Sequence, residues 1–279
     1  MDQRGNTFFK KLLQGIRYRL SPPAADKPIY QLSRLRKIIL KHQPAGAGKL
    51  RKIRIGTHDM FYKDPMEMYH CYVEIFQHGI YDFKAVHSPV RIIDCGANMG
   101  AAVCYLKDRY PQSELIAFEP DENNFALLQQ NAGRLPGVRL EKKAVWTYNG
   151  NISFQHTGTL SSKIGEAKEG VTVTTIDCVR LADYLTNPVD MLKIDIEGAE
   201  YEVLKDCAGS LSNVANLFIE YHGGVHETGK LAEIIRIVEN AGFNLYIKEA
   251  NDILAKPFIQ KNLPHGGFEV QLNIFCYRK

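Results

Sequence analysis

The sequence lacks the features that would assign it to several protein classes. No stretch approaches the ~18 continuous apolar residues that a membrane-spanning helix needs. The N-terminus has no apolar run followed by a small-residue cleavage site, so no signal peptide is predicted. The six cysteines are scattered without a C-x-x-C pair, which disfavours a zinc cluster and indicates reduced, mostly buried thiols. Internal repeats and low-complexity tracts are absent too. We therefore expect a cytoplasmic globular protein.

Acidic residues are nearly missing from one end of the chain. Residues 1–55 contain 14 Lys and Arg but only two Asp, which leaves 21 basic and 29 acidic residues in 56–279. Such asymmetry indicates a basic segment that meets something acidic. We predict a basic helical N-terminal extension over residues 1–55 and a main domain over 56–279, with its core at about 90–279.

The extension has two candidate helices, one over about 8–20 and one over 31–41. Apolar residues recur at helical spacing in both. In the second helix we expect four of them to face inward: Leu32, Leu35, Ile38 and Ile39. Three interpretations stay open for the extension. It could cap the core or a second subunit of a homo-oligomer, lie on the anionic inner face of a membrane, or attract phosphate-bearing substrates.

From residue 90, short apolar runs alternate with amphipathic stretches, which predicts an α/β fold with a mainly parallel sheet. The predicted strands are 90–95, 115–118, 138–146, 191–196, 217–221 and 243–247, and the predicted helices are 100–109, 122–134, 199–207 and 230–241. The last run, 268–277, alternates apolar and polar residues and suits an edge or antiparallel strand. A long insert between 147 and 189 carries two further predicted strands around a polar loop at 157–170.

A glycine-containing turn follows the strand at 90–95 and opens a helix, which is where nucleotide-type cofactors bind in α/β sheets. Gly96 and Gly100 would allow a tight turn and close approach of a ligand. A dinucleotide motif needs a glycine where Asn98 stands, and Asp94 would repel phosphates. S-adenosylmethionine has no phosphate, and its ammonium and sulfonium would be attracted by that carboxylate. The turn therefore favours S-adenosylmethionine over NAD.

The next strand ends in Phe118-Glu119-Pro120, with Glu119 lying 23 residues after Gly96. That spacing is close to the ~20 residues expected for a carboxylate that binds ribose hydroxyls. The alternative is that Glu119 caps the helix that begins near Asp121. By topology, Ala144 and Val145 are the expected wall beside the adenine.

Two acids, Asp195 and Glu197, follow the strand at 191–196, and His222 follows the next strand. The carboxyl ends of parallel strands meet at one edge of a sheet, so these side chains should share a rim. His222 is our first candidate for the general base and Glu197 the second, because a base must accept the proton of an attacking hydroxyl. His222 could instead be structural, or it could hold a divalent metal with Asp195 and Glu220. We predict no metal ligand, because the sequence does not decide between these alternatives.

Four motifs occur in order, and together they resemble the FkbM family of S-adenosylmethionine-dependent methyltransferases. They are Asp94-x-Gly-Ala-Asn-x-Gly100, Phe118-Glu-Pro120, Thr175-Ile-Asp177 and Leu192-Lys-Ile-Asp-Ile-Glu-Gly-Ala-Glu200. The resemblance covers about residues 90–277, with a weaker similarity around 66–81. It implies a Rossmann-like class I methyltransferase fold, with a mainly parallel seven-stranded sheet and an antiparallel last strand. It also implies O-methylation of a hydroxyl on a sugar, glycan or natural-product acceptor, without naming the substrate.

The resemblance matches Asp94, Gly96, Asn98, Gly100 and Glu119 to cofactor-binding positions, and Asp195 and Glu197 to the acidic pair near the reaction centre. The full set of predicted cofactor-binding residues is Asp94, Gly96, Ala97, Asn98, Gly100, Glu119, Pro120, Ala144, Val145 and Asp195. The predicted catalytic residues are His222, Glu197 and Asp195.

Three alternative functions stay open. One is a Rossmann oxidoreductase, which Asn98 disfavours. Another is a protein that binds the cofactor or a partner on the same fold without turnover. Lys193 suggests a nucleic-acid 2′-O-methyltransferase, but the rest of that signature is missing, so nucleic acid is a disfavoured partner.

Overall fold

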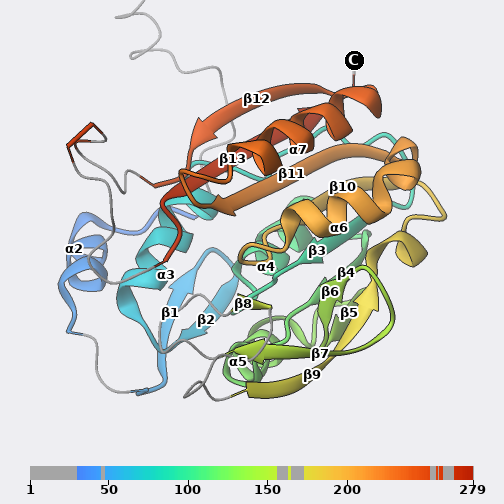
Figure 1. The fold of residues 1–279 in the computed structure, drawn as a ribbon. Coiled ribbons are helices and arrows are strands. Elements are labelled where there is room, and N and C mark those ends of the chain that lie inside the picture. Colours follow the sequence, from blue (N-terminus) through green and yellow to red (C-terminus); the bar gives the residue numbers. More distant parts are fainter. Residues whose placement is uncertain are drawn as a thin grey trace, which may run out of the picture.

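The computed structural model describes residues 30–44, 48–155, 163–164, 173–251, 256, 258–259 and 267–278. The first predicted basic helix, over about 8–20, and most of the polar loop at 157–170 lie outside these residues. The described chain forms a central sheet covered by helices on both faces, a second sheet and a small hairpin (Figure 1). None of the described helices has the length and apolar character required to cross a lipid bilayer.

The central sheet has seven strands in the order β12-β13-β11-β10-β3-β4-β5. Their bounds are β3 Arg91–Cys95, β4 Glu114–Phe118, β5 Val138–Glu141, β10 Val189–Ile194, β11 Val214–Gly223, β12 Asn244–Glu249 and β13 Val270–Tyr277. Strands β5, β4, β3, β10 and β11 run parallel, whereas β13 is antiparallel to both β11 and β12. The predicted mainly parallel sheet with an antiparallel last strand is therefore confirmed.

Helices cover both faces of this sheet, as its parallel strands require. Helices α4 (Ala101–Arg109) and α5 (Glu122–Ala132) share one apolar cluster, and α6 (Glu200–Cys207) and α7 (Thr228–Asn240) share the other. Successive residues of β3 alternate between them: Ile92 belongs to the first cluster and Ile93 to the second. Two short 3-10 helices, η2 Leu181–Tyr184 and η3 Ala208–Asn213, line the second face.

The predicted strand 138–146 is in fact two strands in two different sheets. Strand β5 ends at Glu141, whereas β6 (Ala144–Trp146) belongs to a four-stranded sheet of order β6-β9-β7-β8. The other strands of that sheet are β7 Gly150–Gln155, β8 Lys163–Ile164 and β9 Val173–Arg180. Two consecutive lysines interrupt the apolar run, since Lys142 forms an ion pair with Glu122 and Lys143 forms one with Glu141.

The residues before the central sheet form α2 (Arg34–His42), the hairpin β1 (Arg51–Ile55) and β2 (His58–Tyr62), α3 (Pro65–Cys71) and a π-helical segment η1 (Tyr72–Gln77). The boundary predicted at residue 55 falls inside this hairpin, where Ile55 pairs with His58.

The orientation predicted for the second basic helix is wrong for three of its four apolar residues. Leu35, Ile38 and Ile39 are exposed, whereas Leu32 and Leu40 are buried. The helix α2 packs on α3 with one side only, so its apolar stripe is wider than the surface that covers it. This leaves an exposed apolar stripe flanked by basic residues on the outside of the protein.

Candidate active site

A pocket of about 230 Å³ opens at the carboxyl ends of β3, β4 and β10, the edge at which open α/β sheets bind ligands. Eight of the predicted site residues line it: Gly96, Asn98, Glu119, Pro120, Ala144, Val145, Asp195 and Glu197. Six lining residues were not predicted: Glu67, Phe118, Asp121, Asn124, Lys143 and Ile196. The residues predicted at the glycine turn and those predicted at the end of β10 therefore lie around one cavity.

The glycines of the turn are needed for packing between protein segments rather than for access of a ligand. Gly96 has φ 85°, and a Cβ there would lie 1.7 Å from the backbone oxygen of Asp195. Gly100 has φ 86° and its Cβ would lie 2.8 Å from Leu128 of α5. Gly96 still lines the pocket, but Gly100 and the buried Ala97 do not. Their predicted cofactor contacts stay predictions.

Asp94 also lies behind the pocket wall rather than in it. It is fully buried, and its Oδ1 is 3.1 Å from the Nζ of Lys193. The same ammonium donates to the carbonyl of Gly96 at 2.7 Å and contacts Asp195 at 3.2 Å. Burial would lower the pKa of Lys193, but Asp195 and Asp94 raise it well above its usual value. Lys193 thus neutralises Asp94, which corrects the expectation that this carboxylate faces the cofactor's cationic end.

Glu119 is held by the backbone in the geometry that a ribose-binding carboxylate requires. Its Oε2 accepts the backbone N–H of Asn98 at 2.8 Å, and its Oε1 accepts that of Asp121 at 2.9 Å. Each oxygen keeps a lone pair for one ligand hydroxyl. Asp121, not Glu119, caps α5, which removes the alternative interpretation. Burial raises the pKa of Glu119 to about 7.

Sequence reasoning missed Glu67, which α3 contributes from outside the central sheet. Its Oε1 accepts the side-chain amide of Asn98 at 2.7 Å, and Asn98 itself has a left-handed φ of 49°. The Oδ1 of Asn98 is buried without a partner among the described residues. The only signal was the weak family similarity around 66–81, because no motif links residue 67 to residue 98.

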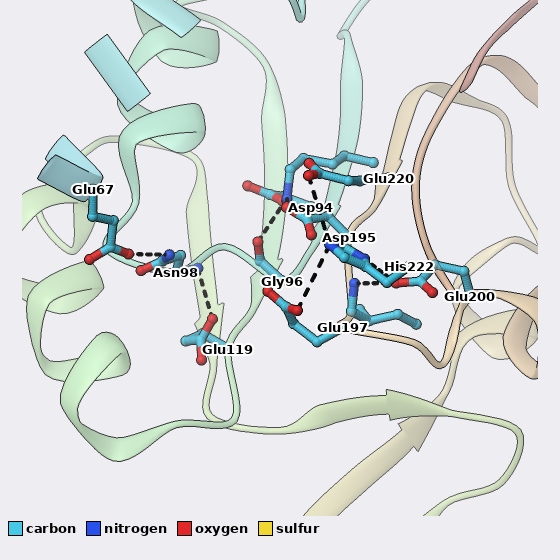
Figure 2. A network of polar contacts seen from close by, with 12 residues as sticks. Glu67, Asp94, Gly96, Asn98, Glu119, Asp195, Glu197, Glu200, Glu220 and His222 are labelled. Atoms are coloured by element: carbon cyan, nitrogen blue, oxygen red, sulfur yellow. Dashed lines mark hydrogen bonds and ion pairs between the residues drawn. The ribbon is translucent and has the colours of Figure 1, made fainter. Parts of the chain in front are cut away.

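Four acidic residues, Asp195, Glu197, Glu200 and Glu220, lie around His222 and are called the acidic rim below. They lie on the opposite side of Gly96 from Glu119, as Figure 2 shows. Glu197 has a left-handed φ of 54°, and its Oε2 is 3.8 Å from Nε2 of His222. The other ring nitrogen, Nδ1, is 3.1 Å from Oε1 of the fully buried Glu200. Glu200 also accepts the backbone N–H groups of Ile196 and Gly198. Glu200 therefore holds both the ring of His222 and the turn at Ile196 and Gly198 in place.

These contacts make His222 a poor general base, which corrects our first choice. Burial would lower its pKa, but the hydrogen bond to Glu200 and the charges of Glu200, Glu197 and Asp195 raise that pKa to about 10. The ring also does not line the pocket. Burial also raises the pKa of Glu197 to about 7. Glu197, our second choice, does line the pocket.

Acidic side chains predominate in the lining of the pocket. Its lining contains one lysine, Lys143, and five carboxylate side chains: Glu67, Glu119, Asp121, Asp195 and Glu197. Such a cavity attracts a cation and repels a pyrophosphate. It therefore suits a positively charged nucleoside better than a dinucleotide.

Comparison with known proteins agrees with this geometry. The profile of the methyltransferase FkbM domain matches residues 94–245. Methyltransferase sdnD of Sordaria araneosa is 26% identical over 219 residues, covering 64% of this chain and 83% of that protein. The hexuronic acid methyltransferase AglP of Haloferax volcanii is 30% identical over 136 residues, 47% of this chain and 56% of that protein.

A further relative, the 2-O-methyltransferase NoeI of Sinorhizobium fredii, is 25% identical over 151 residues, 47% of this chain and 62% of that protein. The matched domain extends over more than half of this chain, from the strand before the glycine turn to β12. The chain is a methyltransferase and belongs to the FkbM family.

Proposed function

We propose that this methyltransferase takes its methyl group from S-adenosylmethionine and transfers it to a hydroxyl of a sugar, glycan or natural-product acceptor. The observation that carries the proposal is the lining of the pocket, where five carboxylates and one lysine surround the glycine turn. A cationic donor is favoured there by Coulomb attraction, and a phosphate-bearing cofactor is not.

The cofactor's parts can be assigned to residues by their chemistry. The two oxygens of Glu119 each have a free lone pair for the ribose hydroxyls. The buried Val145 and Ala144 provide an apolar wall for the adenine. Glu67 and Asp195 line the remaining side and would attract the ammonium.

For the transfer step we assign Glu197 as the general base. Its carboxylate lines the pocket, its side chain is 44% exposed, and among the described residues it accepts no hydrogen bond. The acceptor O–H bond breaks as the proton passes to Glu197, and the oxygen forms a bond to the methyl carbon. The carbon–sulfur bond breaks with its electron pair remaining on sulfur, which leaves S-adenosylhomocysteine and a methyl ether. Alignment of the two reactants would supply much of the acceleration.

The relatives support oxygen as the methylated atom. AglP is named for a hexuronic acid as acceptor, and NoeI is named for 2-O-methylation. The acidic rim could also hydrogen-bond neighbouring hydroxyls of a sugar.

The test is transfer of labelled methyl from S-adenosylmethionine to a panel of sugars and uronic acids. Glu197→Gln should lower kcat by about 10²–10⁴ while the donor's Kd changes little. Glu202→Gln is the matched control, because Glu202 is exposed on α6 and has no contact with the pocket. Methylation of an amine rather than a hydroxyl, or full activity in Glu197→Gln, would sink the proposal.

A further inference from the structure

Asp195, Glu220 and His222 form a cluster of potential metal ligands behind the pocket. One atom from each residue lies within 4.8 Å of the corresponding atom of the other two. Ligands of a single ion at ~2.0–2.3 Å are themselves separated by up to about 4.5 Å. Shifts of a few tenths of an ångström would therefore bring all three side chains onto one ion.

The histidine is already oriented as a metal-binding imidazole. Its Nδ1 is 3.1 Å from Oε1 of Glu200, whose carboxylate is fixed in turn by two backbone N–H groups. A carboxylate bound to one ring nitrogen is the usual arrangement that directs the other nitrogen of a histidine to a metal. Figure 2 shows His222 between Glu200 on one side and the carboxylates of the rim on the other.

The nitrogen directed into the cluster has no hydrogen bond among the described residues. Nε2 of His222 is 3.8 Å from Oε1 of Glu220 and 3.8 Å from Oε2 of Glu197, beyond hydrogen-bond distance, although the side chain is only 3% exposed. An ion could bind between Nε2 and these carboxylate oxygens.

A buried polar atom without a partner among the described residues lies on the strand next to Glu220. Asn273 of β13 lies directly opposite Glu220 of β11, and opposed residues of an antiparallel pair project from the same face. Asn273 is 2% exposed, and its Oδ1 has no partner in the part of the chain described. An amide oxygen is a further ligand type for a divalent cation.

The charges near the cluster are not balanced by the protein. Lys193 forms ion pairs with both Asp94 and Asp195, so its single charge is shared between two carboxylates. Glu220 has no lysine or arginine partner among the described ion pairs; its charged neighbour is His222. A dication would compensate this excess of carboxylates.

We propose that Asp195, Glu220 and His222 bind one divalent transition-metal ion, with Asn273 as an additional oxygen ligand. One imidazole nitrogen with carboxylate oxygens suits ions such as Mn²⁺ or Zn²⁺ better than Mg²⁺ or Ca²⁺, which prefer oxygen alone. Metal binding does not depend on the function proposed above, but the role of the metal in methyl transfer rests on that function. Because Asp195 also lines the pocket, the ion would bind the acceptor oxygen and lower the pKa of its hydroxyl.

The test is titration of the metal-free protein with Mn²⁺. Binding is measured as the loss of the free-ion signal in electron paramagnetic resonance. We expect one ion per chain, with the Kd at least tenfold higher in Glu220→Gln and in Asp195→Asn. The control is Glu239→Gln. Glu239 is an exposed residue of α7 outside the cluster, so its substitution should leave the Kd unchanged.

Far-ultraviolet circular dichroism, measured on the same samples, shows whether each variant is folded. Glu220→Gln is the main variant because Glu220 is partly exposed, whereas replacing the buried His222 risks the fold. No Mn²⁺ binding by folded protein, or equal binding by wild type and Glu220→Gln, would overturn the proposal. Metal binding without methyl transfer to any hydroxyl would instead retain the site and reject the proposed function.

Discussion

The carboxylates on the two sides of the glycine turn differ in how the protein binds them. On the cofactor side, both oxygens of Glu119 accept backbone N–H groups, at 2.8 and 2.9 Å. On the acidic rim, Glu197 and Glu220 accept no hydrogen bond among the described residues, and each is 3.8 Å from the ring of His222. The first side is organised in advance for one fixed ligand. The second retains free lone pairs, as a site of proton transfer or ion binding must.

The largest effect should come from substituting Gly96, which lies between the two sides. Gly96→Ala would place a methyl group 1.7 Å from the backbone oxygen of Asp195 at a φ of 85°. We expect the free energy of unfolding to fall by about 3–5 kcal/mol, measured by urea denaturation.

Gly209→Ala is the matched control, since no heavy atom lies within 4 Å of its Cβ position. It should change the stability by less than about 1 kcal/mol. Equal stability losses in the two variants would show that the contact between the turn and β10 has no special role.

A second prediction separates the cofactor side from the rim. Glu119→Gln replaces one carboxylate oxygen by an amide donor opposite a backbone N–H, so S-adenosylmethionine should bind about 10–100-fold more weakly. Equilibrium dialysis with labelled cofactor measures the change. Glu114→Gln alters an exposed carboxylate of the same strand, β4, and should leave the Kd as in wild type. A wild-type Kd in Glu119→Gln would contradict the ribose assignment.

A third prediction concerns pH, because burial raises the pKa of Glu119 to about 7. The ionised carboxylate is the form that accepts both ribose hydroxyls, so affinity should be complete above pH 8 and decline as pH falls through 7. The expected loss between pH 8 and pH 6 is up to about tenfold. In Glu119→Gln this dependence should flatten, and an unchanged slope in that variant would assign the titration to another group.

The smallest effect is expected in a region outside both sides, the exposed stripe of α2. If this stripe meets an anionic membrane, Ile38→Ser should reduce co-sedimentation with phosphatidylserine vesicles by about threefold without changing cofactor affinity. Tyr246→Ser, an exposed position on β12, is the control. Binding that is indifferent to anionic lipid would remove the membrane interpretation.

The sequence was sufficient for the main sheet because hydrophobic periodicity marks strands and helices locally. It also predicted that Glu119 and Glu197 lie at the carboxyl ends of strands, and both line the pocket there. It failed for Asp94, because nothing local shows that Lys193 reaches back to neutralise it.

The roles of Glu67 and Glu200 were missed for the same reason. Each acts through a partner distant in sequence, Asn98 in one case and His222 in the other. The pKa of His222 depends on its contact with Glu200, which the sequence did not predict. Hydrophobic periodicity therefore could not predict these side-chain networks, because the tertiary fold brings their members together.

The central claim is that the acidic pocket binds a sulfonium nucleoside rather than a dinucleotide. Calorimetric titration of the purified protein with S-adenosylmethionine and, separately, with NAD tests it directly. The account predicts binding of one S-adenosylmethionine per chain and no heat of binding with NAD. Binding of NAD at comparable affinity, or no binding of S-adenosylmethionine by folded protein, would contradict it.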